Sequence, residues 1–134
     1  MEETTRTMLK ALRLPGLLER WDEYARLAEK RNLSSVRWLM RIVEEEYRDR
    51  QERARLCRLQ RAKIPEPYAL ATYPFSEQPK LDKKRLLAIY DAFDYMQKRE
   101  NVLFLGKPGC GKTGLATGFL IQAIERGYTG RFVT

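Results

Sequence analysis

The sequence predicts a mostly α-helical chain, with a helical N-terminal domain followed by the beginning of an α/β domain. Residues 1–64 place apolar side chains at helical spacing almost throughout. A short apolar run at 101–105 leads directly into a glycine-rich segment and then into another helical pattern. This order is typical of the opening of an α/β sheet. We therefore expect a helical domain at 1–64, a proline-rich linker at 65–81, and the start of a second domain at 82–134.

The N-terminal domain is expected to contain three helices, at 4–12, 17–31 and about 35–63. A Pro-Gly pair separates the first two helices. Ser34 or Ser35 is suited to cap the third, because a serine hydroxyl accepts a hydrogen bond from a free N–H group of the first turn.

One stripe of the third helix is apolar and is expected to pack against the first two helices. Its members are Val36, Met40, Val43, Tyr47 and Ala54. Trp21 and Trp38 also fall among apolar positions, so we expect them in the core in preference to a base-stacking role.

The linker contains four prolines that exclude a regular helix: Pro65, Pro67, Pro74 and Pro79. It also contains three aromatic residues, Tyr68, Tyr73 and Phe75, which suggest that it lies against the protein surface.

Four elements are expected in the second domain. Asp82 can cap a helix at 83–99, and 101–105 is expected to be a strand buried on both faces. A helix at 113–126 and the beginning of a second strand at 131–134 complete the chain.

The glycine-rich segment matches the pattern G-x-x-x-x-G-K-[ST], the P-loop or Walker A motif. It consists of Gly106, Lys107, Pro108, Gly109, Cys110, Gly111, Lys112 and Thr113. Its glycines let backbone N–H groups surround phosphate oxygens, and the following helix adds its N-terminal dipole. Lys112 is placed to contact the β- and γ-phosphates of ATP, and the Thr113 hydroxyl is placed to bind Mg²⁺.

The alternative interpretation of this segment is a glycine-rich turn that binds no ligand. We interpret Cys110 as a small filler, with a reactive thiol as its alternative.

Hydrolysis also needs an acidic residue at the end of a second apolar strand, because this Walker B acid holds Mg²⁺ and positions water. After Thr113 the sole acidic residue is Glu125, which falls on the expected helix and not after an apolar strand. No catalytic residue is therefore assigned. These residues support nucleotide binding and not independent hydrolysis.

The chain of 134 residues has a net charge of +8, which favours a polyanionic partner such as nucleic acid or an anionic membrane surface. It contains no histidine, so histidine-based catalysis and histidine-ligated metals are excluded. No apolar run reaches the length of a membrane span, which is about 18 residues. We expect a cytoplasmic protein without a signal peptide, since a P-loop needs intracellular nucleotide.

Positive charge concentrates at 48–63, where six Arg and one Lys face one Asp and one Glu, a net of +5. We interpret this segment as a contact for DNA phosphates that does not read bases. The candidate residues are Arg50, Arg53, Arg55, Arg58, Arg61 and Lys63. The alternative is a solvated helix paired with acidic neighbours such as Glu44, Glu45 and Glu46.

The order of several segments resembles the IstB family, the helper ATPases of insertion-sequence transposition. These segments are LKALRLPG at 9–16, RAKIPEP at 61–67, YPFSEQPKLD at 73–82, ENVLFLGKPGCGKT at 100–113 and ERGY at 125–128. Family members are AAA+ proteins related to the DnaC helicase loaders. The resemblance covers essentially the whole chain.

The resemblance implies ATP-dependent assembly into oligomers on duplex DNA and contact with a partner transposase. It also implies that the segment from Tyr73 to Phe75 lies near the adenine. Family members continue through Walker B, sensors and an arginine finger. We therefore expect a truncated chain with an incomplete nucleotide site, and a sheet that forms poorly because its first two strands are not neighbours in the family.

Two alternatives stay open at this point. One is a DnaC-like helicase loader, with a helicase as partner and single-stranded DNA as ligand. The other is a helical protein-interaction module with a vestigial P-loop.

Overall fold

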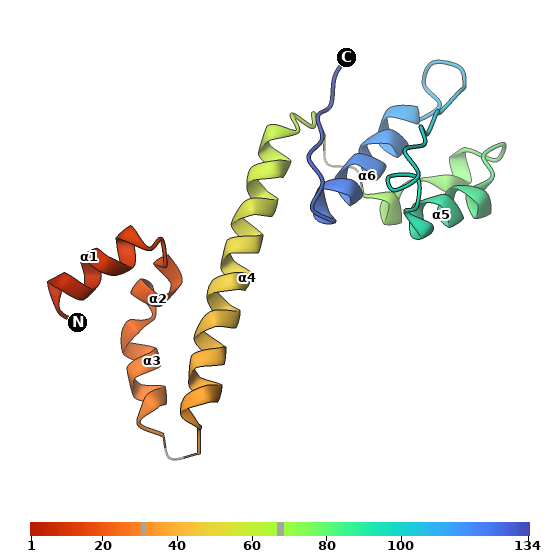
Figure 1. The fold of residues 1–134 in the computed structure, drawn as a ribbon. Helices are drawn as coiled ribbons and strands as arrows, with labels where there is room; N and C mark the ends of the chain where they lie inside the picture. The colour runs from red at the N-terminus through yellow and green to blue at the C-terminus, as the bar shows by residue number, and fades with distance from the viewer. Residues whose placement is uncertain (31, 67–68) are drawn as a thin grey trace. The chain divides into compact units, whose positions relative to one another are not determined.

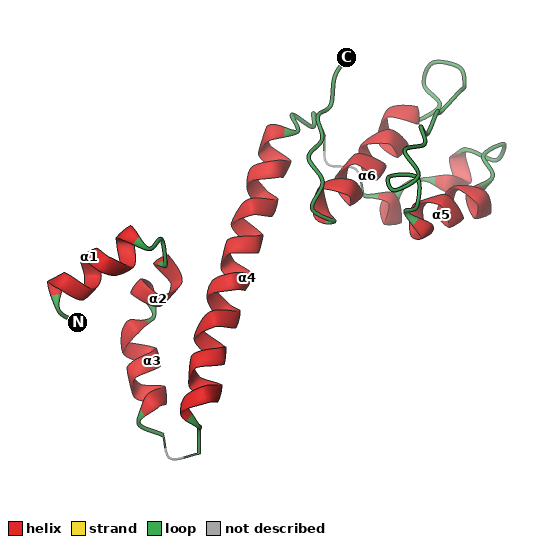
Figure 2. Cartoon of the chain, in the orientation of Figure 1, coloured by secondary structure: helices red, strands yellow, loops and turns green. Residues whose placement is uncertain are grey.

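The computed structural model describes residues 1–30, 32–66 and 69–134. Its described part is helical and contains no strand (Figures 1 and 2). The α-helices are α1 (Glu3–Ala11), α2 (Pro15–Glu19), α3 (Trp21–Ala28), α4 (Ser35–Arg61), α5 (Lys83–Ala92) and α6 (Lys112–Glu125), with short 3₁₀ turns η1 (Leu70–Thr72) and η2 (Phe75–Glu77). The chain forms two units, Met1–Leu56 and Cys57–Thr134. None of the described helices is long and apolar enough to cross a membrane.

The mostly helical class is confirmed, but the expected helix at 17–31 is wrong in detail. It is two helices, because α2 ends at Glu19 and Arg20 adopts a non-helical backbone before α3 begins. Arg31, the last residue of that expectation, lies outside the described residues. Ser34 caps α4 as expected, since its hydroxyl accepts a hydrogen bond from the Arg37 N–H over 3.2 Å.

A tight turn ends α1. The N–H of Leu14 donates to the carbonyl oxygen of Leu9 over 3.0 Å, and the N–H of Arg13 donates to that of Lys10 over 3.1 Å. This pair of bonds is the Schellman motif, which places its closing residue in the left-handed region. Arg13 holds that position with φ of 56°, where glycine is usually preferred. The turn redirects the chain into α2.

Polar contacts join the α2–α3 segment to α4 in the first unit. Going from Arg13 to Tyr24, the partners on α4 run backwards from Arg50 to Trp38, so the two segments are antiparallel (Figure 1). The backbone N–H of Leu17 donates to Glu46 Oε2 over 2.8 Å.

The remaining contacts of this seam extend the same pattern. Arg20 Nη2 pairs with Asp49 Oδ2 at 2.7 Å, the Tyr24 hydroxyl donates to Glu45, and Trp38 Nε1 donates to the Tyr24 carbonyl oxygen over 2.8 Å. Acidic side chains of α4 thus satisfy groups of the preceding helices.

The expected packing face of α4 is wrong. Val36, Met40, Val43 and Tyr47 are exposed large apolar side chains, and Ala54 is exposed too. The face toward α2 and α3 instead carries buried Ile42 and Glu46. Two faces of α4 carry apolar side chains. The more polar face packs against α2 and α3, because its acidic side chains accept hydrogen bonds from those helices. Trp21 and Trp38 are half-buried rather than enclosed.

Phe119 of α6 is at the centre of the second unit's core. Its ring packs against those of Tyr90, Tyr95 and Phe104, with centroids 5.3 to 5.8 Å apart. The contacts with Tyr90 and Phe104 are edge-to-face, a favoured arrangement of aromatic pairs, and the Tyr95 ring is tilted by 45°. Leu70, Leu86 and Leu115 belong to the same cluster.

The expected helix at 83–99 begins correctly and ends too late. Asp82 caps it, with Oδ1 accepting from the Arg85 N–H over 3.1 Å. The helix stops at Ala92 because Phe93 adopts the left-handed conformation, with φ of 50°. This turn lets both Phe93 and Tyr95 enter the core, which residues two apart on a helix could not do.

The expected strands at 101–105 and 131–134 do not pair in the described chain. Val102 and Phe104 pack on the core, while Leu103 and Leu105 are 79% and 92% exposed. This alternation has the period of a strand, but one face is open, so burial on both faces is wrong. The Phe132 N–H instead donates to the Ala62 carbonyl oxygen over 2.7 Å.

In the described part of the linker, the short turns η1 and η2 take the place of a regular helix. Leu70 and the partly buried Tyr73 and Phe75 pack with the core of the second unit. Pro67 and Tyr68 lie outside the described residues.

Candidate functional site

The segment from Gly106 to Thr113 forms a loop that ends on the first turn of α6. Gly109 and Gly111 have positive φ angles of 81° and 76°, which L-residues with a side chain adopt only with strain. Gly111 is the N-cap of α6, so the free N–H groups of the helix begin directly after it. Glycine at these two positions therefore permits the backbone conformation that the loop adopts.

Lys112 folds its side chain back over this loop. Its Nζ donates to the carbonyl oxygens of Gly106 and Lys107 at 2.8 and 2.7 Å. The ammonium group is thereby held within the loop, close to the backbone that would surround a phosphate. Thr113 is exposed on the first helical turn, so its hydroxyl can be reached by a ligand.

Tyr73 reaches the same loop from the preceding segment. Its hydroxyl lies 3.3 Å from the Cys110 carbonyl oxygen and 3.4 Å from that of Gly111, within donating distance of both. A Cβ atom added at Gly111 would overlap this hydroxyl. Burial raises the pKa of Tyr73, so the hydroxyl keeps its proton for donation.

Further contacts hold Tyr73 in place. Its ring packs edge-on against Phe75 with centroids 4.9 Å apart, and Lys83 Nζ lies 4.8 Å from the centre of the Phe75 ring. The family resemblance implies that Tyr73 to Phe75 lies near the adenine, but it does not predict this hydroxyl contact. The tyrosine itself was the available signal, because a half-buried phenol needs a polar partner.

The described residues contain no cluster of three His, Cys, Asp or Glu side chains able to hold a metal ion. A magnesium ion here would depend on the Thr113 hydroxyl and on phosphate oxygens. Glu125 is the last residue of α6 and Lys112 the first, so they lie about 20 Å apart along the helix at 1.5 Å per residue. Glu125 is too far away to act as a Walker B acid.

The basic candidates on and after α4 have different surroundings. Arg50 Nη2 donates to the Arg13 carbonyl oxygen over 2.7 Å, and Arg53 lies 3.8 Å from Glu46. Arg55 makes a two-pronged contact with Glu52, with distances of 2.9 and 2.6 Å.

Arg58, Arg61 and Lys63 belong to the second unit. Arg58 donates from Nε and Nη2 to the Ile124 carbonyl oxygen, at 3.2 and 3.0 Å. Arg61 and Lys63 are exposed and make no ion pair within the described chain. The expected pairing with acidic neighbours thus applies to some of the arginines and not to others.

Residues 7–134 match the family described as IstB-like ATP binding proteins. The chain belongs to this family. A Geobacillus stearothermophilus protein described as an ATP-binding protein of insertion sequence IS5376 is 34% identical over 134 residues, covering 100% of this chain and 53% of the relative. A Bacteroides fragilis protein described as an insertion sequence IS21-like ATP-binding protein is 30% identical over 123 residues, covering 92% of this chain and 61% of the relative.

This IstB-like chain spans about half the length of the curated relatives it matches. A Pseudomonas aeruginosa relative, an ATP-binding protein of insertion sequence IS21 by its description, is 28% identical and is covered over 47% of its length. The resemblance drawn from the sequence is confirmed at the level of the family. The matched half is the N-terminal part of the IstB-like proteins.

Proposed function

We propose that this IstB-like chain binds the triphosphate of ATP, with Mg²⁺, in the loop from Gly106 to Thr113. The observation that carries the proposal is the combination of two positive-φ glycines, the N-terminus of α6 and a lysine already folded into the loop. Backbone N–H groups and a helix dipole favour an anion at such a place. Phosphate would draw Lys112 Nζ away from the carbonyl oxygens of Gly106 and Lys107, because a charged acceptor makes the stronger bond.

In this proposal Thr113 supplies the protein ligand to Mg²⁺, and the ion neutralises charge between the β- and γ-phosphates. Tyr73 holds the carbonyl side of the loop, so that the N–H groups are free for the phosphates. We infer no hydrolytic step for these residues, since Glu125 lies at the far end of α6.

We further propose that the protein acts in the cytoplasm on duplex DNA, as a helper of insertion-sequence transposition with a transposase as partner. Support comes from membership of the IstB-like family and from the net charge of +8. The sequence-predicted contacts are Arg50, Arg53, Arg55, Arg58, Arg61 and Lys63. Self-association driven by ATP belongs to the same proposal for the full-length protein.

A nucleotide titration with a matched pair of lysine variants tests the proposal. Lys112→Ala should reduce binding of a fluorescent ATP analogue at least tenfold, because it removes the cation that meets the β- and γ-phosphates. Lys84→Ala, on the exposed side of α5, removes the same charge elsewhere in the second unit and should leave binding unchanged. Equal loss in both variants would show that only net charge matters, and would contradict a P-loop site.

The DNA part needs a separate measurement. Duplex affinity should fall with salt, and each phosphate contact should steepen the log–log slope by about 0.9. Tighter binding to single-stranded DNA, together with capture of a replicative helicase, would favour the helicase-loader alternative instead.

A further inference from the structure

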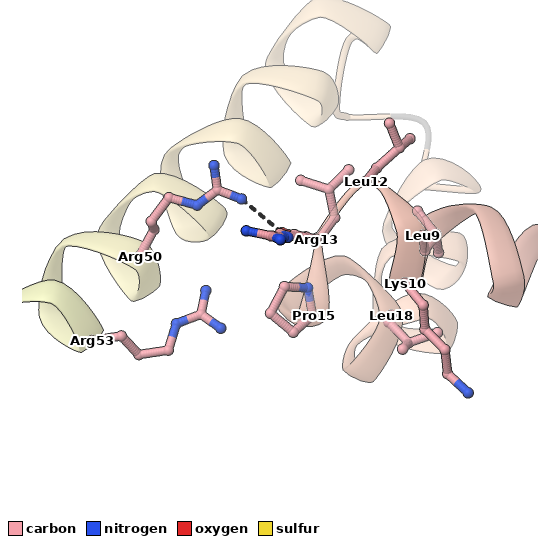
Figure 3. Close-up of a pocket in the computed structure, with 9 residues that line it drawn as sticks. Leu9, Lys10, Leu12, Arg13, Pro15, Leu18, Arg50 and Arg53 are labelled. Atoms are coloured by element: carbon pink, nitrogen blue, oxygen red, sulfur yellow. Dashed lines mark hydrogen bonds between the residues drawn. The ribbon is translucent and has the colours of Figure 1, made fainter. Parts of the chain in front are cut away.

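An open cleft in the first unit gathers four cations (Figure 3). Its volume is about 610 Å³. Lys10 and Arg13 line it from the end of α1 and the following turn, and Arg50 and Arg53 line it from α4. The other lining residues are the apolar Leu9, Leu12, Leu14, Pro15 and Leu18. Among the described residues that line it, none is Asp or Glu.

One hydrogen bond fastens the two walls of this cleft. Arg50 Nη2 donates to the Arg13 carbonyl oxygen over 2.7 Å, as the dashed line in Figure 3 shows. These residues are 37 positions apart in sequence, so the bond brings distant cations together. Arg13 sits in the left-handed position of the Schellman turn, where glycine would be less strained. The positively charged Arg13 side chain is therefore carried by a backbone conformation that is unfavourable for residues other than glycine.

The charges of the cleft are only partly neutralised. Glu46 Oε1 lies 3.8 Å from Arg53 Nη2, and the other Glu46 oxygen accepts from the Leu17 N–H. Lys10, Arg13 and Arg50 make no ion pair in the described chain, and all three are exposed. An excess of positive charge thus faces solvent.

We propose that this cleft holds the phosphodiester backbone of duplex DNA, an inference that rests on the DNA binding proposed above and deepens it. Three of the four cations are arginines, whose planar fork matches a pair of phosphate oxygens. A protruding backbone can enter a concave surface, whereas a flat anionic bilayer cannot. The apolar lining gives the deoxyribose a surface to pack against. This proposal adds Lys10 and Arg13 to the candidate DNA contacts. It also assigns Arg50 and Arg53 to the same binding surface.

The test compares two double variants of the whole chain on a labelled duplex of random sequence over a salt series. Lys10→Gln/Arg13→Gln removes two charges from the cleft and leaves the Arg13 carbonyl bond in place. Arg26→Gln/Arg37→Gln removes two charges from exposed positions of the same unit outside the cleft. The cleft variant should bind about tenfold more weakly at low salt, with a log–log slope shallower by about 1.8 for two lost phosphate contacts. The control should keep the parental slope.

Circular dichroism and thermal melting establish whether each variant folds. If Lys10→Gln/Arg13→Gln melts early, Lys10→Gln/Arg53→Gln tests the same cleft without altering the strained turn. Equal loss in cleft and control variants would overturn the cleft while leaving DNA binding intact. A parent chain that binds no duplex would overturn both proposals. Binding to phosphatidylserine vesicles that only the cleft variant loses, without an effect on DNA, would overturn the choice of ligand.

Discussion

The hydroxyl of Tyr73 lies 3.3 Å from the carbonyl oxygen of Cys110 and so joins the segment before α5 to the loop at 106–113. These residues are 37 positions apart in sequence. The contact lies at the point where the loop passes into α6, since Cys110 precedes the N-cap residue Gly111. A side chain outside the motif therefore contacts the loop.

Tyr73→Phe should weaken ATP binding and lower the stability of the second unit by about 1 kcal/mol, the usual contribution of one hydrogen bond. The ring and its packing on Phe75 remain, so the effect isolates the hydroxyl. Tyr128→Phe is the matched control, because Tyr128 packs on Phe93 and its hydroxyl makes no hydrogen bond to the described part of the chain. Thermal melting and a nucleotide titration measure both effects. Unchanged ATP affinity in Tyr73→Phe would show that the loop does not need this contact.

Gly111→Ala should be more harmful than Gly109→Ala, although both glycines have positive φ. Each substitution adds backbone strain of about 1 kcal/mol. At Gly111 the new Cβ would also overlap the Tyr73 hydroxyl, whereas at Gly109 nothing lies within 4 Å. Adding Tyr73→Phe to Gly111→Ala should recover part of the loss, because the overlapping oxygen is gone. Melting of the two single variants and the double variant checks this order.

Arg58→Ala should lower the stability of the second unit by about 1–2 kcal/mol, because its guanidinium satisfies the Ile124 carbonyl at the end of α6. Arg61→Ala, one turn further along α4 and exposed, should have no such effect. Urea unfolding followed by circular dichroism separates the two. The opposite order would mean that the Arg58 contact contributes nothing to folding.

Lowering the pH should reduce the stability of the first unit, because Glu45 then becomes protonated. The hydrogen bond from the Tyr24 hydroxyl, reinforced by Arg41 and Arg20, lowers the pKa of Glu45 below its usual range. A lowered pKa in the folded chain favours the ionised form. The stabilisation is therefore present above the unfolded value near pH 4.3, and is lost as the pH falls through the lowered pKa. It should amount to about 1 kcal/mol.

Tryptophan fluorescence reports this loss directly, since both tryptophans, Trp21 and Trp38, lie in the first unit. Glu45→Gln should flatten the dependence of stability on pH below pH 5. Glu44→Gln, on an exposed position beside it, should keep that dependence. An unchanged acid profile in Glu45→Gln would assign the effect to other carboxyl groups.

The sequence predicted the helical class and the Ser34 and Asp82 caps, because these depend on short-range chemistry. It failed where tertiary partners choose between local options. The packing face of α4 was wrong because Glu46 accepts a hydrogen bond from Leu17 of α2 and Asp49 accepts one from Arg20, between α2 and α3. Sequence periodicity does not show these donors. The end of α5 was predicted too late because Phe93 adopts a left-handed backbone conformation. This conformation allows the rings of Phe93 and Tyr95 both to be buried. For 101–105 the pattern is that of a strand, but a ladder needs a partner strand.

In the candidate site, too, some features follow from the local sequence and others from contacts between distant residues. The motif itself predicts which residues surround a phosphate, whereas Tyr73 and the pairing of Arg13 with Arg50 arise from contacts across 37 positions each. Side-chain type hinted at both, since a half-buried phenol needs an acceptor and an arginine needs an anion or a carbonyl. Which partner each one finds required the fold.

The central claim is that this chain holds a nucleotide by its phosphates, and calorimetric titration with MgATP, MgADP and adenosine tests it most directly. The loop predicts measurable heat from MgATP and MgADP, with ATP the tighter ligand because Lys112 and Mg²⁺ both meet its terminal phosphates. Adenosine should give none at the same concentrations. No heat from MgATP, or equal binding of adenosine, would contradict nucleotide binding through the phosphates.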